Sequence, residues 1–377
     1  MKKYDAVIAG YLCVDMIPGF PNNRHETGVS ALLQPGKLIE IDGLDFVMGG
    51  VVANTGMAMK KFGRNVFLNG LTGDDLLGKI VRDYFQKYDL LDGMQVTSEV
   101  GTAFSIVLAP PGIDRIFLES PGCNQLLDAD FIDFEAVAQS RLFHFGYPPL
   151  LRKFYLNKGE QLSAMLSAIK RAGTVTSMDF SLPDGESESG RQDWPAVMEQ
   201  VLPYTDIFVP SLEEALRTMI PERYERMVSE SGDADLIDRI PMDLIRETGR
   251  RIIDCGVKVL VIKAAHRGIY LLTGDISGLK ERGLQMDKND WNFRERWCNA
   301  YPADPARVKD ATGAGDTAVA AFLSALLDGS TPETALKFAA LAGRNNLYCR
   351  DLYEELDDWQ TMEREIDQVP VEVIHLK

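Results

Sequence analysis

The stretch Asp310-Ala311-Thr312-Gly313-Ala314-Gly315-Asp316 determines how the rest of this sequence is interpreted. Two glycines around one alanine leave little side chain, so another molecule can approach the backbone closely. The apolar run 317–327 follows at once and predicts a buried helix that ends at Asp328-Gly329. The glycines therefore stand at a helix N-terminus, where unpaired N–H groups and the positive end of the helix dipole favour an anion.

Asp316 supplies a carboxylate at this place. A carboxylate does not bind phosphate, but beside a phosphate cradle it can take a proton from a hydroxyl that attacks phosphorus. The alternative is a simple helix cap, because Asp is a favoured N-cap residue. A second alternative is the dinucleotide fingerprint G-x-G-x-x-A at 313–318. That fingerprint should follow a buried strand, whereas residues 303–310 hold a proline and four charges, and an aspartate in the turn would repel a pyrophosphate.

The composition is that of a soluble globular protein with one large domain or two. The 377 residues are 45% hydrophobic and 25% charged. The net charge of −16 argues against nucleic acid or an anionic membrane as partner. Five dispersed cysteines without a C-x-x-C pair, and only four histidines, argue against a zinc site and favour the reducing cytoplasm. No apolar stretch approaches the roughly 20 residues that span a bilayer.

Strand and helix patterns alternate along most of the chain, which predicts a mainly parallel sheet covered on both faces. Strand-rich segments between residues 10 and 50 and around 100–120 depart from this alternation and predict a small second sheet. Within the first of them, 19–36 is expected to be a loop and 37–48 to form exposed strands. No fold is predicted for 275–303, and 221–240 is polar and charged. The expected strands are 4–10, 65–71, 142–145, 174–180, 206–209, 257–262, 269–272 and 369–376, and the expected helices are 51–62, 74–88, 156–172, one near Trp194, one from Ser211 and one ending at Cys255.

Four motifs resemble one family. The stretch 310–316 is similar to D-T-x-G-A-G-D, the C-terminal signature of the ribokinase-like (PfkB) carbohydrate kinases. Gly49-Gly50-Val51-Val52-Ala53-Asn54 resembles that family's G-G-x-x-x-N, and 73–78 resembles its G-D-D-x-x-G. Asp15 lies after the first strand, where such enzymes place a substrate-binding aspartate. The matches occur in the family's order and span most of the chain.

The resemblance implies a ribokinase-like α/β fold, a doubly wound, mainly parallel sheet with helices on both faces and a small β lid. A single domain of residues 1–377 would carry that lid on parts of 11–48 and 98–120. The implied reaction transfers the γ-phosphate of ATP, with Mg²⁺, to a hydroxyl of a sugar, sugar acid or nucleoside. Edge strands of a lid commonly pair, which favours a homodimer.

Site residues are carried over position by position. Asp316 is the expected base, and the backbone N–H groups of Gly313, Ala314 and Gly315 form the expected anion hole. Such donors act on charge that appears only in the transition state. The expected contacts to the sugar hydroxyls are Asp15, Gly50 and Asn54, together with Arg115 and Asn124 from the lid region. The alternatives are a turn aspartate for Asp15 and an internally satisfied helix-start residue for Asn54.

The nucleotide motifs depart from the family pattern. The family's N-x-x-E becomes Ser211-Leu212-Glu213-Glu214, its T-x-G becomes Lys263-Ala264-Ala265, and Ala311 replaces a threonine. Glu214 could ligate Mg²⁺ or only favour a helix start, and Lys263 could touch a phosphate or end a strand in solvent. A monovalent cation near Asp310 is expected by analogy alone. The expected nucleotide-binding residues are Ser211, Glu214, Lys263, Gly268, Thr312, Gly313 and Gly315.

Two rival functions follow from the same residues. The altered nucleotide motifs suit a non-catalytic sugar or nucleoside binder derived from such a kinase, whereas Asp316 with both glycines favours an enzyme. A dehydrogenase is the weaker third reading. Residues 73–79 also mimic a Walker A loop, but Ile80 replaces the Ser or Thr that would hold magnesium. His144, between two phenylalanines, is predicted to be a core residue, and Asp74 and Asp75 are expected to cap the helix that follows them.

Overall fold

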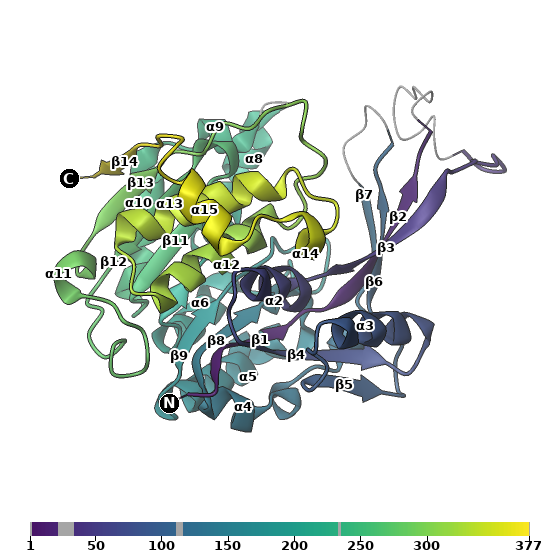
Figure 1. Cartoon of the computed structure of the whole chain (residues 1–377), viewed down its shortest axis with the longest axis horizontal. Helices are drawn as coiled ribbons and strands as arrows, with labels where there is room; N and C mark the ends of the chain where they lie inside the picture. The colour runs from purple at the N-terminus through teal and green to yellow at the C-terminus, as the bar shows by residue number, and fades with distance from the viewer. Residues whose placement is uncertain (1, 22–33, 111–115, 233–234, 377) are drawn as a thin grey trace.

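A ten-stranded sheet forms the body of the protein (Figure 1). The computed structural model describes residues 2–21, 34–110, 116–232 and 235–376. The strand order is β14-β13-β12-β11-β10-β9-β8-β1-β4-β5, parallel from β11 to β5 and antiparallel from β11 to β14. The strands are β1 (Tyr4–Gly10), β4 (Val66–Gly73), β5 (Met94–Thr97), β8 (Ser140–Gly146), β9 (Val175–Met178), β10 (Ile207–Phe208), β11 (Val259–Lys263), β12 (Ile269–Thr273), β13 (Glu295–Cys298) and β14 (Val373–His375).

Helices cover both faces of this sheet, which confirms the doubly wound architecture. One face carries α2 (Val51–Lys61), α3 (Leu76–Lys87), α11 (Lys288–Trp291), α12 (Ala314–Leu327), α13 (Pro332–Asn346), α14 (Leu352–Glu355) and α15 (Trp359–Glu365). The other carries α4 (Phe134–Ala138), α5 (Arg152–Arg171), α6 (Trp194–Val201), α7 (Leu212–Met219), α8 (Pro221–Ser231), α9 (Leu236–Arg239) and α10 (Met242–Asp254).

Strand β1 shows why the central strands are apolar without alternation. Its residues Ala6 and Ile8 belong to the core under α2 and α12, and Val7 and Ala9 belong to the core on the opposite face. All four side chains are fully buried. A parallel strand between two helical layers needs apolar residues on both sides, which gives the continuous apolar run that predicted the strand.

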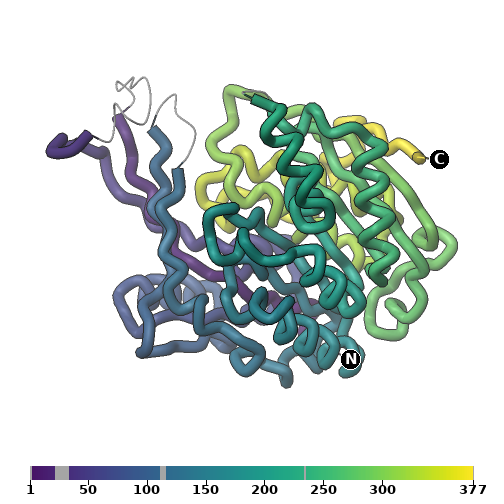
Figure 2. The backbone as a smooth tube through the Cα atoms, turned by 180° about the vertical axis from the view of Figure 1, so that it is seen from behind, coloured from purple at the N-terminus to yellow at the C-terminus, as the bar shows by residue number. Residues whose placement is uncertain are grey.

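A second, four-stranded sheet projects from the body, as Figures 1 and 2 show from opposite sides. This small sheet has the order β3-β2-β6-β7 and consists of β2 (Cys13–Gly19), β3 (Gly43–Gly49), β6 (Phe104–Leu108) and β7 (Ile116–Ser120). Gly10 precedes β2 and Gly50 follows β3, and both glycines have a positive φ. A Cβ on Gly10 would lie 1.8 Å from the Gly146 carbonyl oxygen, and one on Gly50 would lie 2.4 Å from that of Tyr11. Neither position can therefore hold a side chain.

Several sequence expectations were incomplete. The polar segment 221–240 forms α8 and α9, and 275–303 contributes α11 and β13. Helix α13 was not predicted, although the Thr331 hydroxyl caps it by accepting from Thr334 N and a proline follows the cap. The expected exposed strands across 37–48 reduce to β3, because residues 37–42 form no ladder. Most of the expected loop at 19–36 lies outside the described residues.

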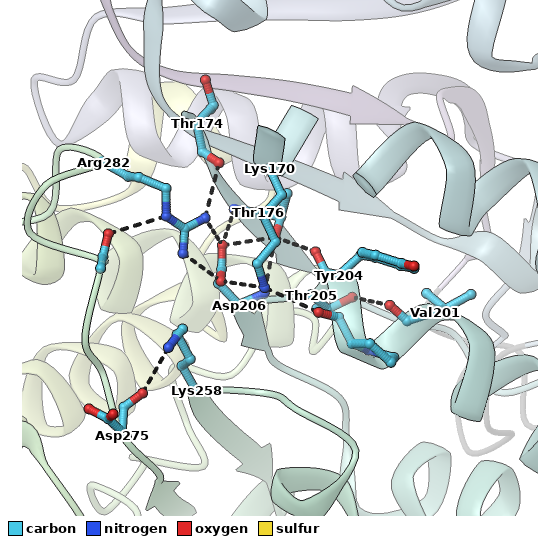
Figure 3. Close-up of polar contacts among 12 residues, drawn as sticks. Lys170, Thr174, Thr176, Val201, Tyr204, Thr205, Asp206, Lys258, Asp275 and Arg282 are labelled. Carbon is cyan, nitrogen blue, oxygen red and sulfur yellow. Dashed lines mark hydrogen bonds and ion pairs between the residues drawn. The ribbon is translucent and has the colours of Figure 1, made fainter. Parts of the chain in front are cut away.

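A buried ion network fixes the segment that precedes α11 (Figure 3). Asp206 is fully buried before β10, and Arg282 donates to both of its carboxylate oxygens at 2.5 and 2.7 Å. Lys170 lies 2.9 Å from the same carboxylate, and Thr176 N donates at 3.1 Å. Burial alone would raise the pKa of Asp206, but hydrogen bonds and charge from Arg282 outweigh it and lower that pKa. The network therefore ties residue 282 to the sheet.

Candidate active site

The expected base, Asp316, lies where the strand order of the large sheet reverses, between β1 and β8. Asn54 Nδ2 on α2 donates to Asp316 Oδ2 at 3.0 Å, and the neighbouring Thr55 hydroxyl donates to Oδ1 at 3.4 Å. Tyr147, directly after β8, also donates its phenol O–H to Oδ1. The crevice at the carboxyl ends of the strands, at such a reversal, is where open α/β sheets bind ligands. Asp316 thus stands at the expected place, buried and held by three donors.

The helix behind Asp316 begins without a side-chain cap. Gly313 is the N-cap residue, with φ 75° and ψ 0°, and no side chain bonds to this helix end. Asp316 lies inside the first turn, and its carboxylate is engaged by α2 and Tyr147, so the capping interpretation is wrong. The dinucleotide reading also fails, because residues 299–313 contain no strand. The Ala314 N–H lies 3.3 Å from the Ala311 carbonyl oxygen, a long contact.

A cavity of about 330 Å³ opens beside this helix start. The small sheet lines it with residues that include Asp15 and Phe46, and the body lines it with Asn54, Gly313 and Asn346, among others. Burial raises the pKa of Asp15 to about 6, against hydrogen bonds from Cys13 and Ser105. A Cβ on Gly49 would lie 2.5 Å from Asp15 Oδ2, so the G-G motif makes room for this carboxylate. Polar side chains therefore converge in one cavity, and one of them, Asn54, bonds to Asp316.

Ser211 and Glu214 form a capping box at the start of α7. The Ser211 hydroxyl accepts from Glu214 N at 3.3 Å, and Glu214 Oε2 accepts from Ser211 N at 2.6 Å. Glu214 is nevertheless half-buried rather than exposed, and burial raises its pKa to about 7. Ser211 also pairs with Lys263 through an isolated parallel bridge. The two altered nucleotide motifs are therefore neighbours.

Lys263 does not end its strand in solvent. Its side chain is 15% exposed, and Nζ lies 2.7 and 2.9 Å from the two carboxylate oxygens of Asp179. Burial raises the pKa of Asp179 to about 6 against the opposing charge of Lys263. Burial would lower the pKa of Lys263, but the charges of Asp179, Glu214 and Asp316 outweigh it and raise that pKa.

Other expected residues lie away from the cavity or outside the described residues. Asn124 is fully buried, does not line the cavity, and donates to the Leu12 carbonyl at 3.0 Å. Arg115 lies outside the described residues. Gly268 turns the chain at φ +122°, and a Cβ there would lie 2.1 Å from the Cys298 carbonyl oxygen. Thr312 lines the cavity, and its hydroxyl donates to Asp310 Oδ1 at 2.9 Å.

Two further predictions concerned residues outside the site. Asp75, expected to cap the following helix, accepts from Gly78 N at 2.7 Å as the N-cap of α3. His144, predicted to be a core residue, is fully buried and shares a 2.9 Å hydrogen bond between Nδ1 and the Ser177 hydroxyl. Burial lowers its pKa to about 3, so the ring is neutral. Both predictions are confirmed.

The comparisons with known proteins agree with this geometry. A family model described as pfkB family carbohydrate kinase matches residues 23–357. The chain belongs to this family. The probable fructokinase-2 of Arabidopsis thaliana is 24% identical over 322 residues, which cover 85% of this chain and 80% of that protein.

Solved structures confirm the ribokinase-like fold expected of a pfkB family member. Arabidopsis thaliana ribokinase complexed with ribose and ATP aligns with a TM-score of 0.68 at 18% identity, over 96% of this chain and 98% of that one. A ribokinase II from E. coli in complex with ATP and Mg²⁺ aligns with a TM-score of 0.68 at 17% identity, over 97% and 99% of the two chains. Among the described residues, no helix is long and apolar enough to span a membrane.

Three residues of this candidate site were not predicted from the sequence, namely Tyr147, Asp179 and Asn346. Tyr147 follows β8 and Asp179 follows β9, so both stand at the carboxyl ends of parallel strands. Polar residues at those ends were a usable signal, because such ends meet at the ligand-binding edge of the sheet. Asn346 accepts from the Thr317 hydroxyl at 2.8 Å and donates to the Thr312 carbonyl at 2.8 Å. It lies on α13, the helix that the sequence analysis did not identify.

Proposed function

We propose that this protein transfers the γ-phosphate of ATP to a hydroxyl of a sugar, sugar acid or nucleoside, with Asp316 as general base. Membership of the pfkB family supports sugar kinase activity. The observation that carries the mechanism is the position of Asp316, buried at an uncapped helix start beside a cavity with convergent polar groups. A non-catalytic binder has no use for such a carboxylate.

The acceptor hydroxyl is held and deprotonated by groups of this chain. Asp15 accepts hydrogen bonds from sugar hydroxyls and Asn54 donates to them, and Gly50 allows the Tyr11 carbonyl to approach the start of α2. Asp316 accepts the hydroxyl proton as the oxygen attacks phosphorus, and a positioned base contributes about 10²–10⁴ in rate. Asn54 and Tyr147 keep the Asp316 carboxylate in one orientation through bonds to its two oxygens.

The N-terminal turn of α12 stabilises charge on the phosphoryl group. Backbone N–H groups of residues 313–315 stand at the positive end of the helix dipole, as an anion hole requires. Glycine at 313 allows the positive φ of this turn. Gly315, near Lys263, and Thr312, near Asp310, complete the expected phosphate-binding edge. Gly268 allows the turn of the loop that follows Lys263.

The donor set near this turn suits a magnesium nucleotide. Structural neighbours of this chain are complexes with ATP, and one holds ATP and Mg²⁺. Glu214 lies near the ammonium of Lys263 but is not the carboxylate paired with it, which is Asp179, and carboxylate oxygen is what Mg²⁺ prefers. Glu214 would hold the ion, with Ser211 fixing its side chain. When bound, Mg²⁺ neutralises phosphate charge. A monovalent cation near Asp310 stays a prediction.

The test is ADP release from MgATP across a panel of sugars, sugar acids and nucleosides. Asp316→Asn is measured beside the parent, with Asp328→Asn as the matched control, because Asp328 lies at the other end of α12 and its side chain is 41% exposed. Acceptor-dependent turnover that collapses only in Asp316→Asn supports the proposal. If neither protein turns over while one panel member raises the melting temperature of both, the chain is a sugar or nucleoside binder instead.

The small sheet also supports a homodimer. Its outer strands β3 and β7 are both edges, and they carry exposed apolar side chains, with Phe46 44% and Phe117 50% exposed. Edge strands with apolar side chains pair readily with another chain. Sedimentation equilibrium of the parent and of Phe117→Lys tests this expectation, since a dimer formed through this sheet dissociates in the variant.

A further inference from the structure

The ammonium group of Lys263 stands over the first turn of α12. A Cβ built on Gly315 would lie 3.7 Å from Lys263 Nζ, 3.7 Å from its Cδ and 3.8 Å from its Cε. Apart from the neighbouring residues and the backbone of α12 itself, the three heavy atoms nearest to that position therefore all belong to Lys263. Lys263 ends β11, so the strand and the helix start bring one cation to the backbone N–H groups of the expected anion hole.

Asp179 holds this ammonium in place. Both of its carboxylate oxygens accept from Nζ, and Oδ1 also accepts from Phe180 N at 2.8 Å. Asp179 is 1% exposed and directly follows β9, so it is a rigid anchor. The charges that face Lys263 are the carboxylates of Asp179, Glu214 and Asp316, and neutral His144 lies near it as well. One ammonium thus stands among three carboxylates beside the helix start.

We propose that Lys263 is a further donor of the anion hole, contacting the phosphoryl group during transfer, and that Asp179 is the positioning residue that aims it. This inference rests on the proposed kinase function. In the transfer step the acceptor oxygen forms a bond to the γ-phosphorus while the bond from that phosphorus to the β-phosphate oxygen breaks. The hydroxyl proton goes to Asp316, and the leaving electron pair stays on ADP. Charge develops on the γ-phosphoryl oxygens, where a fixed ammonium stabilises it.

The simpler role for Lys263 is to neutralise the buried charge of Asp179, and a double-variant cycle separates the two roles. The variants are Lys263→Met, Asp179→Asn and the combination of both, each measured for kcat, KM of ATP and melting temperature. Loss of one anion-hole donor lowers kcat by about 10²–10³. If Lys263 contacts the phosphoryl group, the double variant stays as slow as Lys263→Met, because Asp179 acts only through Lys263.

Recovery in the double variant would overturn the inference. If Lys263 only compensates Asp179, removing both charges restores kcat to within about threefold of the parent, since no unpaired buried charge is left. The double variant also keeps the test informative if Lys263→Met alone fails to fold. Lys258→Met is the matched control, because Lys258 precedes the other end of β11 and donates to the Asp275 carbonyl at 2.9 Å.

Nucleotide binding gives a second readout that does not depend on the acceptor. Calorimetric titration of parent and variants with ATP and with ADP shows whether Lys263 contacts the γ-phosphate. We expect Lys263→Met to lose about tenfold in ATP affinity, with ADP affinity unchanged. An unchanged ratio of ATP to ADP affinity contradicts the inference. A parent that turns over no acceptor contradicts the proposed function itself, so the two failures are distinguishable.

Discussion

Tyr147 and Asp316, 169 residues apart in the chain, share a hydrogen bond from the phenol O–H to the carboxylate Oδ1. Asn54 donates to the other oxygen of the same carboxylate, at 3.0 Å. Burial, and then the charge of Asp316, raises the pKa of Tyr147 well above its ordinary value, so the phenol keeps its proton and remains a donor. The proposed base is thus fixed on both oxygens by neutral groups.

Replacing the base should abolish turnover without removing binding. Asp316→Asn keeps the size and the buried position of the side chain but cannot accept the hydroxyl proton. We expect kcat to fall by about 10²–10⁴, with the KM of the acceptor changed by less than about threefold. Steady-state kinetics of parent, Asp316→Asn and Asp328→Asn measure this. A variant that retains more than a tenth of parental kcat would rule out Asp316 as base.

Removing the phenol should affect kcat more than KM. Tyr147→Phe deletes the donor to Asp316 Oδ1 but keeps the ring that contacts Tyr11. The carboxylate then loses one of its restraints, and we expect kcat to fall about tenfold with nucleotide affinity unchanged. Tyr155→Phe is the control, since its hydroxyl donates to Glu188 at 3.2 Å outside the site. Equal losses in both variants would indicate a structural effect.

Asp15 should make acceptor binding depend on pH. Its pKa is raised to about 6, chiefly by burial, so the carboxylate is ionised at pH 7 and protonated near pH 5. An ionised carboxylate accepts hydrogen bonds from sugar hydroxyls more strongly than the neutral acid does. We expect the KM of the acceptor to rise as the pH falls from 7 to 5. In Asp15→Asn, KM should be raised about tenfold or more and be independent of pH over that range.

The same residue should cost stability above pH 6. The folded-state pKa of Asp15, about 6, exceeds the unfolded value of about 3.9, so folding favours its protonated form. The stability linked to this carboxyl is present below the unfolded pKa and lost as the pH rises through the folded one. Asp15→Asn should therefore raise the melting temperature at pH 7. A lower melting temperature would show that the carboxylate supports the fold.

Asp206 should stabilise the fold at neutral pH and lose this effect in acid, which is the opposite of the behaviour expected for Asp15. Its folded-state pKa is lowered, so its contribution is present above the unfolded pKa of about 3.9 and is lost as the pH falls through the folded value. At pH 7, Asp206→Asn leaves Arg282 and Lys170 without their buried partner, and we expect unfolding free energy to fall by about 3–5 kcal/mol. Urea unfolding at pH 7 and pH 3 measures this.

The control for that change is Asp275→Asn. Asp275 is exposed and its carboxylate accepts hydrogen bonds from Ser277, so we expect no measurable change in the free energy of unfolding. The difference between Asp206→Asn and the parent should shrink at pH 3. A loss of the same size at both pH values would contradict the ionic origin of the effect.

The sequence predicted the layered fold because its signals are local. The apolar run of β1 and the glycine turn before α12 can each be recognised from a few consecutive residues. The structure of residues 275–303 cannot be recognised in this way, because it depends on a distant contact: Arg282 is held by Asp206, which lies 76 residues earlier in the chain. Their only strand, β13, is recognisable once it pairs with β12 and β14.

The site was predictable to the same extent. Asp316, Asn54 and Asp15 lie in motifs, and the structure brings them together around one cavity or one carboxylate. Tyr147 and Asp179 lie in no motif, and their roles depend on contacts with residues 169 and 84 positions away. Spacing along a chain carries no information about such contacts until the order of the strands is known.

The position of α12 late in the chain, packed between α2 and α13, has a consequence for synthesis. A nascent chain that has left the ribosome up to about residue 300 already contains Asn54, Tyr147 and Lys263, yet it lacks the Asp316 carboxylate that these residues face. These residues are thus synthesised before the proposed base, and before Gly313 and Asn346, which line the cavity. Under the proposed mechanism, a copy that ends before Asp316 lacks the base and cannot transfer phosphate, so activity is gained only once α12 has packed between α2 and α13.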